Sequence, residues 1–212
     1  MAIIPADEKV FMVDKRTNTT YGGSQALQDM QQWYTMQDVA DSVQPYKVFT
    51  ALLTQSGGDD PYNIGAENPV TLGITYNIAF NSNDVDLTVF GAPNSNVGTH
   101  FICTTAGTLP NDPDLLLRYN SGAPVATVLE NTIGNIWFTY TGVGNYGVNS
   151  NGLFTLNKTW QSPTNYNLPN DITEGYNFAI FDNNSGAFFV FQEGNLQDSS
   201  LVNTPIEIRV YN

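Results

Sequence analysis

The chain has 212 residues, enough for one larger β domain or two small ones, and either can bury a core. Its formal net charge of -13 reflects seven Lys plus Arg against twenty Asp plus Glu. Since neutralising phosphates needs clustered basic side chains, we expect no nucleic-acid partner. Charged residues make up 13% of the chain, below the ~25% of an ordinary soluble domain, so neutral polar side chains must cover the surface.

The N-terminus and the single cysteine limit where the protein is made and how it is stabilised. "MAIIPADEKV" has no basic region and no long apolar region, so we expect no signal peptide and synthesis in a cytoplasm. No window reaches the ~18 consecutive apolar residues of a membrane span, so we expect no membrane partner. Cys103 has no second cysteine to pair with and is predicted to be a small buried hydrophobe.

Residues 1–45 form the first predicted region, with a short helical segment. Residues 8–22 predict a hairpin or an extended arm with a polar turn at 14–18. Ser24 can cap a helix that carries an apolar stripe, and a second short helix restarts near Thr35 and ends before Pro45. The stripe has the three- and four-residue spacing of one helix face and consists of Ala26, Leu27, Met30, Trp33 and Tyr34.

The chain after Pro45 is predicted to be β throughout. Short runs of β-branched, aromatic and apolar residues alternate with Gly, Asn, Asp and Pro, which is typical of a sandwich or barrel. We therefore predict a mainly β protein with an antiparallel, sandwich or jelly-roll-like domain. The predicted strands are 46–55, 75–80, 87–90, 100–104, 115–119, 125–129, 135–141, 152–156, 176–181, 187–192 and 206–211.

Two similar breaks in this β region raise the question of an inserted domain. "LTQSGGDDP" interrupts a strand at Gly57-Gly58, and "YNSGAP" repeats a Ser-Gly pair about sixty residues later. Paired turns of this kind predict a small β module at 59–121, inserted into a β domain made of 46–58 plus 122–212. The alternative is two ordinary loops in one continuous domain.

The candidate chemical motifs all favour structural interpretations. "GVGNYG" leads into a strand and not a helix, so it predicts a hairpin turn and not a nucleotide site. His100 is the single histidine and lies in a predicted strand, which leaves no base for a hydrolase triad and no zinc ligand set. Asn81, Asn83, Asp84 and Asp86 fit an Asx-rich turn better than a calcium loop. We expect no catalytic residue, no cofactor and no metal.

Several stretches together resemble a family of virion proteins from tailed bacteriophages. They are "YKVFTALLTQSG", "APVATVLENTIGNIWFTYTGVGNYGV", "LFTLNKTW" and "NTPIEIRVYN", and the opening "MAIIPADEKVFMV" with "QQWYTMQDV" fits the same family. The stretch "LGITYNIAFNSNDVDLTVFGAPNSNVGTHFICTTAGTLP" resembles a small module of phage structural proteins, although Asp86-Leu87 and residues 106–110 depart from its pattern. The resemblance implies a virion component and supplies no catalytic residue.

From this resemblance we expect a head fibre or capsid decoration protein that is attached to other virion proteins through residues 1–45. We expect a homo-oligomer, with a trimer favoured. The attachment residues predicted from the apolar N-terminal segment are Ile3, Ile4, Phe11, Leu27, Met30 and Trp33. The alternative for these side chains is an ordinary helical cap over the β core.

Two rival functions stay open at the level of the sequence. A tail fibre or receptor-binding adhesin would recognise a host surface glycan or protein with aromatic residues in loops, for which Tyr62, Tyr146 and Tyr166 are the candidates. An envelope-polysaccharide hydrolase would need two carboxylates that converge from distant strands. No internal repeat of a long β-helix supports the second rival.

Overall fold

A computed structural model describes residues 11–14, 19–22, 45–162 and 174–212. The chain divides into two compact units, Met1–Pro45 and Tyr46–Asn212. In the first unit, β1 (Phe11–Asp14) pairs antiparallel with β2 (Thr19–Gly22), so the predicted hairpin is confirmed. The predicted helices of residues 23–44 lie outside the described residues.

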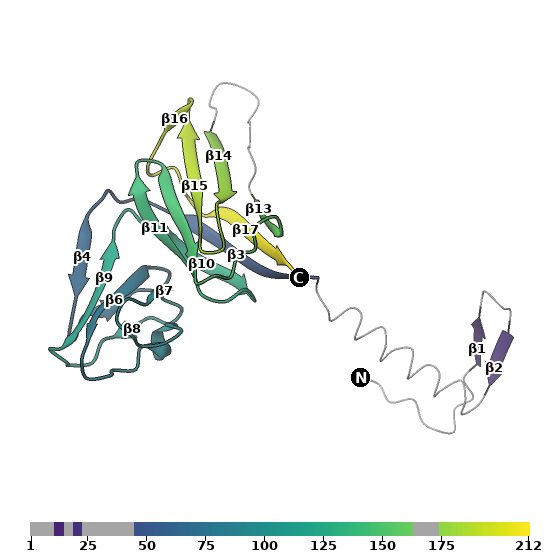
Figure 1. Ribbon diagram of the computed structural model, residues 1–212, viewed down its shortest axis with the longest axis horizontal. Helices are drawn as coiled ribbons and strands as arrows, with labels where there is room; N and C mark the ends of the chain where they lie inside the picture. Colours follow the sequence, from purple (N-terminus) through teal and green to yellow (C-terminus); the bar gives the residue numbers. More distant parts are fainter. Residues whose placement is uncertain (1–10, 15–18, 23–44, 163–173) are drawn as a thin grey trace. The chain divides into compact units, whose positions relative to one another are not determined.

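The second unit is mainly β, as predicted, and two of its antiparallel sheets form a sandwich (Figure 1). The first sheet has the order β10 (Val125–Asn131), β3 (Tyr46–Thr54), β17 (Thr204–Tyr211) and β13 (Thr159–Ser162). The second has the order β11 (Ile136–Gly142), β12 (Asn145–Ser150), β15 (Ser185–Gln192) and β14 (Glu174–Ile180), with β16 (Asn195–Leu196) paired to β15. The jelly-roll-like description of this sandwich stays a prediction.

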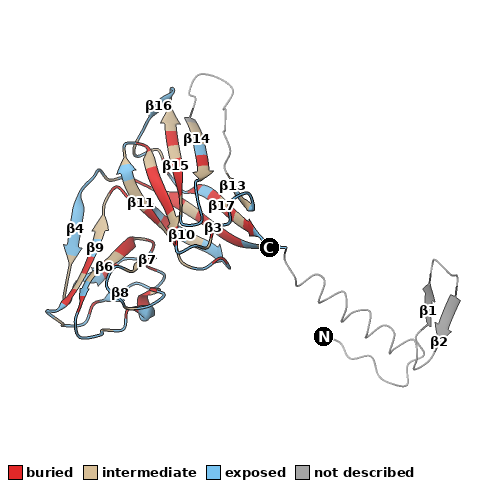
Figure 2. Cartoon of the chain, viewed as in Figure 1, coloured by how far each residue is buried: buried red, intermediate tan, exposed pale blue. Residues whose placement is uncertain are grey.

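The sandwich core follows directly from the alternation of apolar residues along the strands. In β3 and β17 every second side chain is buried, because successive side chains of a strand point to opposite faces. These side chains pack against aromatic and branched residues of the second sheet. Figure 2 shows buried residues, in red, along strands of both sheets. The core includes Phe49, Ala51, Leu53, Phe138, Tyr146, Val148, Phe178, Phe188, Val190, Ile206, Ile208 and Val210.

Residues between the two Ser-Gly breaks form a second set of sheets with a core of its own. One sheet has the order β4 (Pro61–Ile64), β9 (Leu115–Asn120), β6 (Thr75–Asn81) and β7 (His100–Ile102). A two-stranded sheet pairs β5 (Pro69–Val70) with β8 (Gly107–Thr108). We call this part the module; its buried residues include Val70, Tyr76, Ile78, Leu87, Phe90, Phe101, Cys103, Leu109, Leu115 and Leu117.

The two breaks lie against each other. The Ser121 amide donates to the Asp60 carbonyl at 3.0 Å, and the Ser121 hydroxyl donates to the Gly58 carbonyl at 2.9 Å. A Cβ atom on Gly57 would lie 2.3 Å from the Ser121 carbonyl oxygen, so this approach needs glycine. The chain thus leaves the sandwich and returns to it at one point.

Two predicted strands are wrong. Residues 88–90 form the 3-10 helix η1 (Thr88–Phe90), because Asp86 Oδ1 accepts from both the amide and the hydroxyl of Thr88, and Gly91 ends the turn with a φ of 100°. Residues 152–156 run without a strand partner in the described chain. Gly152 has a φ of 75°, and the Phe154 amide donates to the Asn183 carbonyl in a loop contact.

Three local predictions are confirmed. Cys103 is buried. Residues 142–145 form the turn between β11 and β12, where Gly144 has a φ of 59°. The Asn81 side chain donates to the carbonyls of Val85 and Ser95 and accepts from the Val85 amide, all within 3.0 Å, as in an Asx-rich turn.

Candidate ligand groove between the module and the sandwich

The module is fixed to the edge strand β11 of the sandwich. The Phe138 amide donates to Thr75 Oγ1 at 3.3 Å, and Asn135 Nδ2 donates to the His100 carbonyl at 2.8 Å. The His100 ring stacks on the Trp137 ring with 5.4 Å between centroids and 13° between planes. These side-chain contacts attach β6 and β7 of the module to β11 and to Asn135, which precedes it.

A row of polar side chains crosses all four strands of the module sheet. The strand register places Asn63 opposite Arg118, Arg118 opposite Asn77, and Asn77 opposite His100. Arg118 Nε donates to Asn63 Oδ1 at 3.1 Å, and Asn77 Nδ2 lies 3.2 Å from His100 Nδ1. These two hydrogen bonds link the four side chains in two pairs. We call these four residues the polar row.

Asn77, His100 and Arg118 of the polar row and several aromatic residues border a groove of about 320 Å³. The groove lies where the module sheet meets the sandwich, and we call it the inter-module groove. It is lined by Pro61, Thr75, Tyr76, Asn77, His100, Arg118, Tyr119, Asn120, Ala123, Phe138, Thr139 and Tyr140. Its volume is at the lower end of the ~300–1,000 Å³ typical of small-molecule sites.

Three tyrosine rings cluster on the face of the module sheet opposite the polar row, because Tyr62, Tyr119 and Tyr76 are each next in sequence to a polar-row residue. Tyr119 carries the ring of Tyr62 stacked on it, with 5.1 Å between centroids and 14° between planes. Tyr76 meets Tyr119 edge to face at 5.6 Å, and its hydroxyl accepts from the Thr71 amide at 3.0 Å. Tyr62 is 46% exposed and is not among the residues that line the groove.

Tyr140 is held in place by the carboxylate of Asp198. The Tyr140 hydroxyl donates to Asp198 Oδ2 at 2.8 Å, while the Tyr146 hydroxyl and the Gly144 amide donate to Asp198 Oδ1 at 3.0 and 2.8 Å. Loss of solvent and the nearby carboxylate raise the pKa of Tyr140 to about 12, and the same two causes raise the pKa of Tyr146 further. Both phenols therefore stay protonated, and the carboxylate acts as a structural acceptor.

His100 supplies a neutral ring to the groove. Burial lowers the pKa of His100 below its ordinary value, partly opposed by a hydrogen bond to the Gly98 backbone. The ring is therefore uncharged at neutral pH, which leaves Arg118 as the cation of the polar row. In the described part of the chain, no group of three or more His, Cys, Asp and Glu side chains is placed to hold a metal ion.

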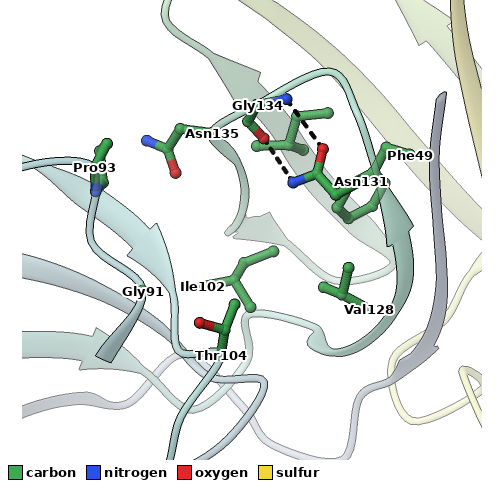
Figure 3. Close-up of a pocket in the computed structure, with 10 residues that line it drawn as sticks. Phe49, Gly91, Pro93, Ile102, Thr104, Val128, Asn131, Gly134 and Asn135 are labelled. Carbon is green, nitrogen blue, oxygen red and sulfur yellow. Dashed lines mark hydrogen bonds between the residues drawn. The ribbon is translucent and has the colours of Figure 1, made fainter. Parts of the chain in front are cut away.

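A second cavity on this boundary is less suited to a polar ligand. Its volume is about 160 Å³, and Phe49, Ile102 and Val128 contribute apolar side chains to it (Figure 3). The Asn131 side chain makes its hydrogen bonds within its own loop. It donates to the Gly134 carbonyl at 2.7 Å and accepts from the Gly134 amide at 3.0 Å. Asn135, a second polar side chain of this cavity, also has its amide nitrogen engaged, donating to the His100 carbonyl.

The structure separates the three predicted ligand tyrosines. Tyr62 is exposed on β4 and does not line the groove. The prediction that Tyr146 lies in an exposed loop is wrong, because the preceding turn is short and Tyr146 is already the second residue of β12, fully buried in the core. Tyr166 lies outside the described residues.

The predicted attachment residues fall in the N-terminal unit. Phe11 begins β1, and its side chain is not among those described. The other five lie outside the described residues: Ile3, Ile4, Leu27, Met30 and Trp33.

Sequence reasoning missed the polar row. Its signal lies in "TYNIAFN" and "LLLRYN", where Asn77 and Arg118 break otherwise apolar runs at positions opposite to the buried ones. Such residues look like the solvent side of a half-buried sheet. Their alignment across four strands depends on the register, which these short segments do not reveal.

The chain matches no protein-family model, and neither a curated protein nor a solved structure matches it. Among the described residues, no helix has the length and apolar character needed to cross a membrane.

Proposed function

We propose that the protein is an accessory structural protein on the surface of a phage particle, most simply a head fibre or capsid decoration. Residues 1–45 attach it to other virion proteins and to sister copies, with three copies expected, and Tyr46–Asn212 is displayed outward. The observation that supports this division of labour is the split into two compact units at Pro45. The family resemblance of both regions to phage virion proteins gives the biological setting.

The β unit is suited to display because its stability is internal. Its two core clusters are formed by its own buried side chains. Its surface is rich in neutral polar residues, and the chain carries a net charge of -13, which favours solubility and disfavours non-specific binding to nucleic acid. A unit of this kind can stand away from the particle while another segment holds it there.

The test is binding of the purified chain to particles that lack it. We expect the full chain to co-sediment with such particles, and Ile4→Asp together with Trp33→Asp to lower the bound fraction at least tenfold. Val202→Asp is the control, because Val202 is 70% exposed on the β unit and the substitution leaves residues 1–45 unchanged. Equal binding of the double variant and the full chain would overturn attachment through residues 1–45.

A second candidate function is a tail receptor-binding protein. The inter-module groove favours it, because Phe138 and Tyr140 line the groove together with the polar side chains of Asn77, His100 and Arg118. In that case the chain would be located at the tail, and soluble chain would compete with phage adsorption to host cells. If the chain is located at the head and does not compete with phage adsorption, the tail receptor-binding function is ruled out and the decoration function stands.

A further inference from the structure

We propose that a recess on the first sandwich sheet binds a carboxylated sugar, with the Trp160 ring as the stacking surface and Lys158 as the partner of the carboxylate. This inference concerns a ligand of the β unit and does not depend on where in a particle the chain is located.

The recess lies where β13 begins and β17 ends. Its volume is about 360 Å³, within the ~300–1,000 Å³ typical of small-molecule sites. Two large aromatic residues that line it are exposed, Trp160 by 42% and Tyr211 by 39%. We call it the sheet-end recess; its lining residues are Asn157, Lys158, Thr159, Trp160, Tyr211 and Asn212.

The strand register places the aromatic rings around the recess on one face of the sheet. Trp160 is opposite Arg209, and Tyr211, two residues further along β17, is opposite Tyr46. Directly opposed residues share a face of a sheet, and so do residues two apart in one strand. This face is the outer one, because Val210, between Arg209 and Tyr211, belongs to the sandwich core.

The Trp160 ring is oriented before any ligand arrives. The Arg209 guanidinium carbon lies 4.9 Å from the centre of the Trp160 ring and 4.8 Å from that of Tyr46, and Arg209 Nε donates to the Glu207 carboxylate. A pyranose presents a flat face of C–H groups, which an indole ring complements. A ring that is already oriented loses less freedom on binding than an unsupported one.

Three of the four basic residues of the β unit gather at this end of the sandwich. The β unit contains fourteen Asp plus Glu, so such a cluster is a local exception. Lys158 lines the recess, and Arg209 lies over the Trp160 ring. Lys47 lines an adjoining cavity of about 330 Å³ that Lys158 also borders. The fourth basic residue, Arg118, is in the module.

Lys158 is the cation best placed for an acidic ligand. Among the described residues, the ion pair of the β unit joins Arg209 to Glu207, and neither Lys158 nor Lys47 forms an ion pair there. A lysine ammonium on its flexible stem can reach a carboxylate whose position is set by the stacked sugar ring. This local positive charge on an acidic chain favours a carboxylated sugar over a neutral one.

The binding test uses the full chain and pairs of probes that differ in charge. The acidic probes are trigalacturonate and 3′-sialyllactose, and their neutral counterparts are the methyl ester of trigalacturonate and lactose. Saturation-transfer difference NMR detects binding, and isothermal titration gives the dissociation constant. We expect at least one acidic probe to bind with a millimolar or tighter constant, and at least tenfold more tightly than its neutral counterpart.

Two variants locate the site, and each has a matched control in the module. We expect Trp160→Ala, which removes the stacking ring, and Lys158→Gln, which removes the cation, each to weaken binding of the acidic probe at least fivefold. Tyr62→Ala is the control for the ring, because Tyr62 is also an exposed aromatic residue, 46% accessible. Arg118→Gln is the control for the charge. Both controls should bind the acidic probe as the unmodified chain does.

Three outcomes would overturn the proposal: no acidic probe binds, a neutral counterpart binds as tightly as its acidic probe, or a module control loses as much affinity as the recess variant it matches. Circular dichroism and the thermal midpoint of each variant show whether a loss reflects unfolding. Should Trp160→Ala unfold, Trp160→Leu keeps an apolar side chain without the flat ring and takes its place. Particle attachment is measured separately through residues 1–45, so either idea can fail without the other.

Discussion

The sandwich and the module reach a stable core by different means. In the sandwich, strands of up to nine residues alternate buried and outward side chains, and the aromatic residues of two sheets fill the space between them. In the module, strands are shorter, and side chains such as Asn81, Asp86 and Asn94 fix long loops by hydrogen bonds to nearby groups. The alternation of apolar residues along the strands is therefore enough to build the core of the sandwich, whereas the module also depends on individual polar side chains.

Removing a large core ring from the sandwich should give the largest effect. Phe188 is 1% exposed and packs against Tyr176 and Phe178 at 5.8 Å. We expect Phe188→Ala to lower the free energy of unfolding by about 3–5 kcal/mol, because it removes buried contacts and leaves a cavity. Urea unfolding followed by fluorescence measures this. A loss below about 1 kcal/mol would mean that the sandwich core is not packed as described.

The junction between the two regions should be the next most sensitive. In Gly57→Ala the new methyl group would lie 2.3 Å from the Ser121 carbonyl oxygen, so the paired breaks must move apart. We expect a cost of about 1–3 kcal/mol, as for other overpacked sites.

Gly58→Ala is the matched control for the junction, because its Cβ would have nothing within 4 Å. Its expected effect is below about 0.5 kcal/mol, as for other surface substitutions. Equal stabilities of the two alanine variants in urea would show that the breaks do not approach each other closely.

We expect the module to lose stability when a buried polar side chain is removed, just as the sandwich loses stability when a buried apolar side chain is removed. Asn81 is 8% exposed and makes three hydrogen bonds to the loop backbone. We expect Asn81→Ala to cost about 1–3 kcal/mol, because two carbonyls and one amide lose their partner. Hydrogen exchange should quicken in residues 82–99 and stay unchanged in β3 and β17. Uniform quickening would show that the two regions unfold together.

The smallest expected effect is the pH dependence that His100 contributes. Burial lowers the pKa of the folded-state ring below the ordinary value of about 6.5, so between the two values the unfolded chain binds more protons. His100 should therefore destabilise the folded chain as the pH falls below about 6.5. We expect the stability of the unmodified chain to fall more between pH 7.5 and 5.5 than that of His100→Gln. Equal losses would contradict a buried, neutral His100.

The sequence predicts those strands in which the alternation of apolar residues matches the way the strand pairs in its sheet. β17 keeps strict alternation, β3 does so from Phe49 onward, and the β11–β12 turn contains glycine where the backbone needs a positive φ. Residues 87–90 have the composition of a strand, yet the Asp86 side chain competes for the backbone and a short helix forms. The prediction that Tyr146 lies in a loop was wrong, because the turn before it is short and β12 already begins at Asn145. The inter-module groove was not predictable, because it depends on how the module sits on β11.

Electron cryomicroscopy of purified phage particles tests most directly the proposal that this chain is a virion surface protein, since it shows location, copy number and orientation together. The account predicts density for the β unit on the outer surface of the particle, with residues 1–45 at the contact with another virion protein. Particles without such density, or a β unit buried within the shell and residues 1–45 pointing to solvent, would contradict it.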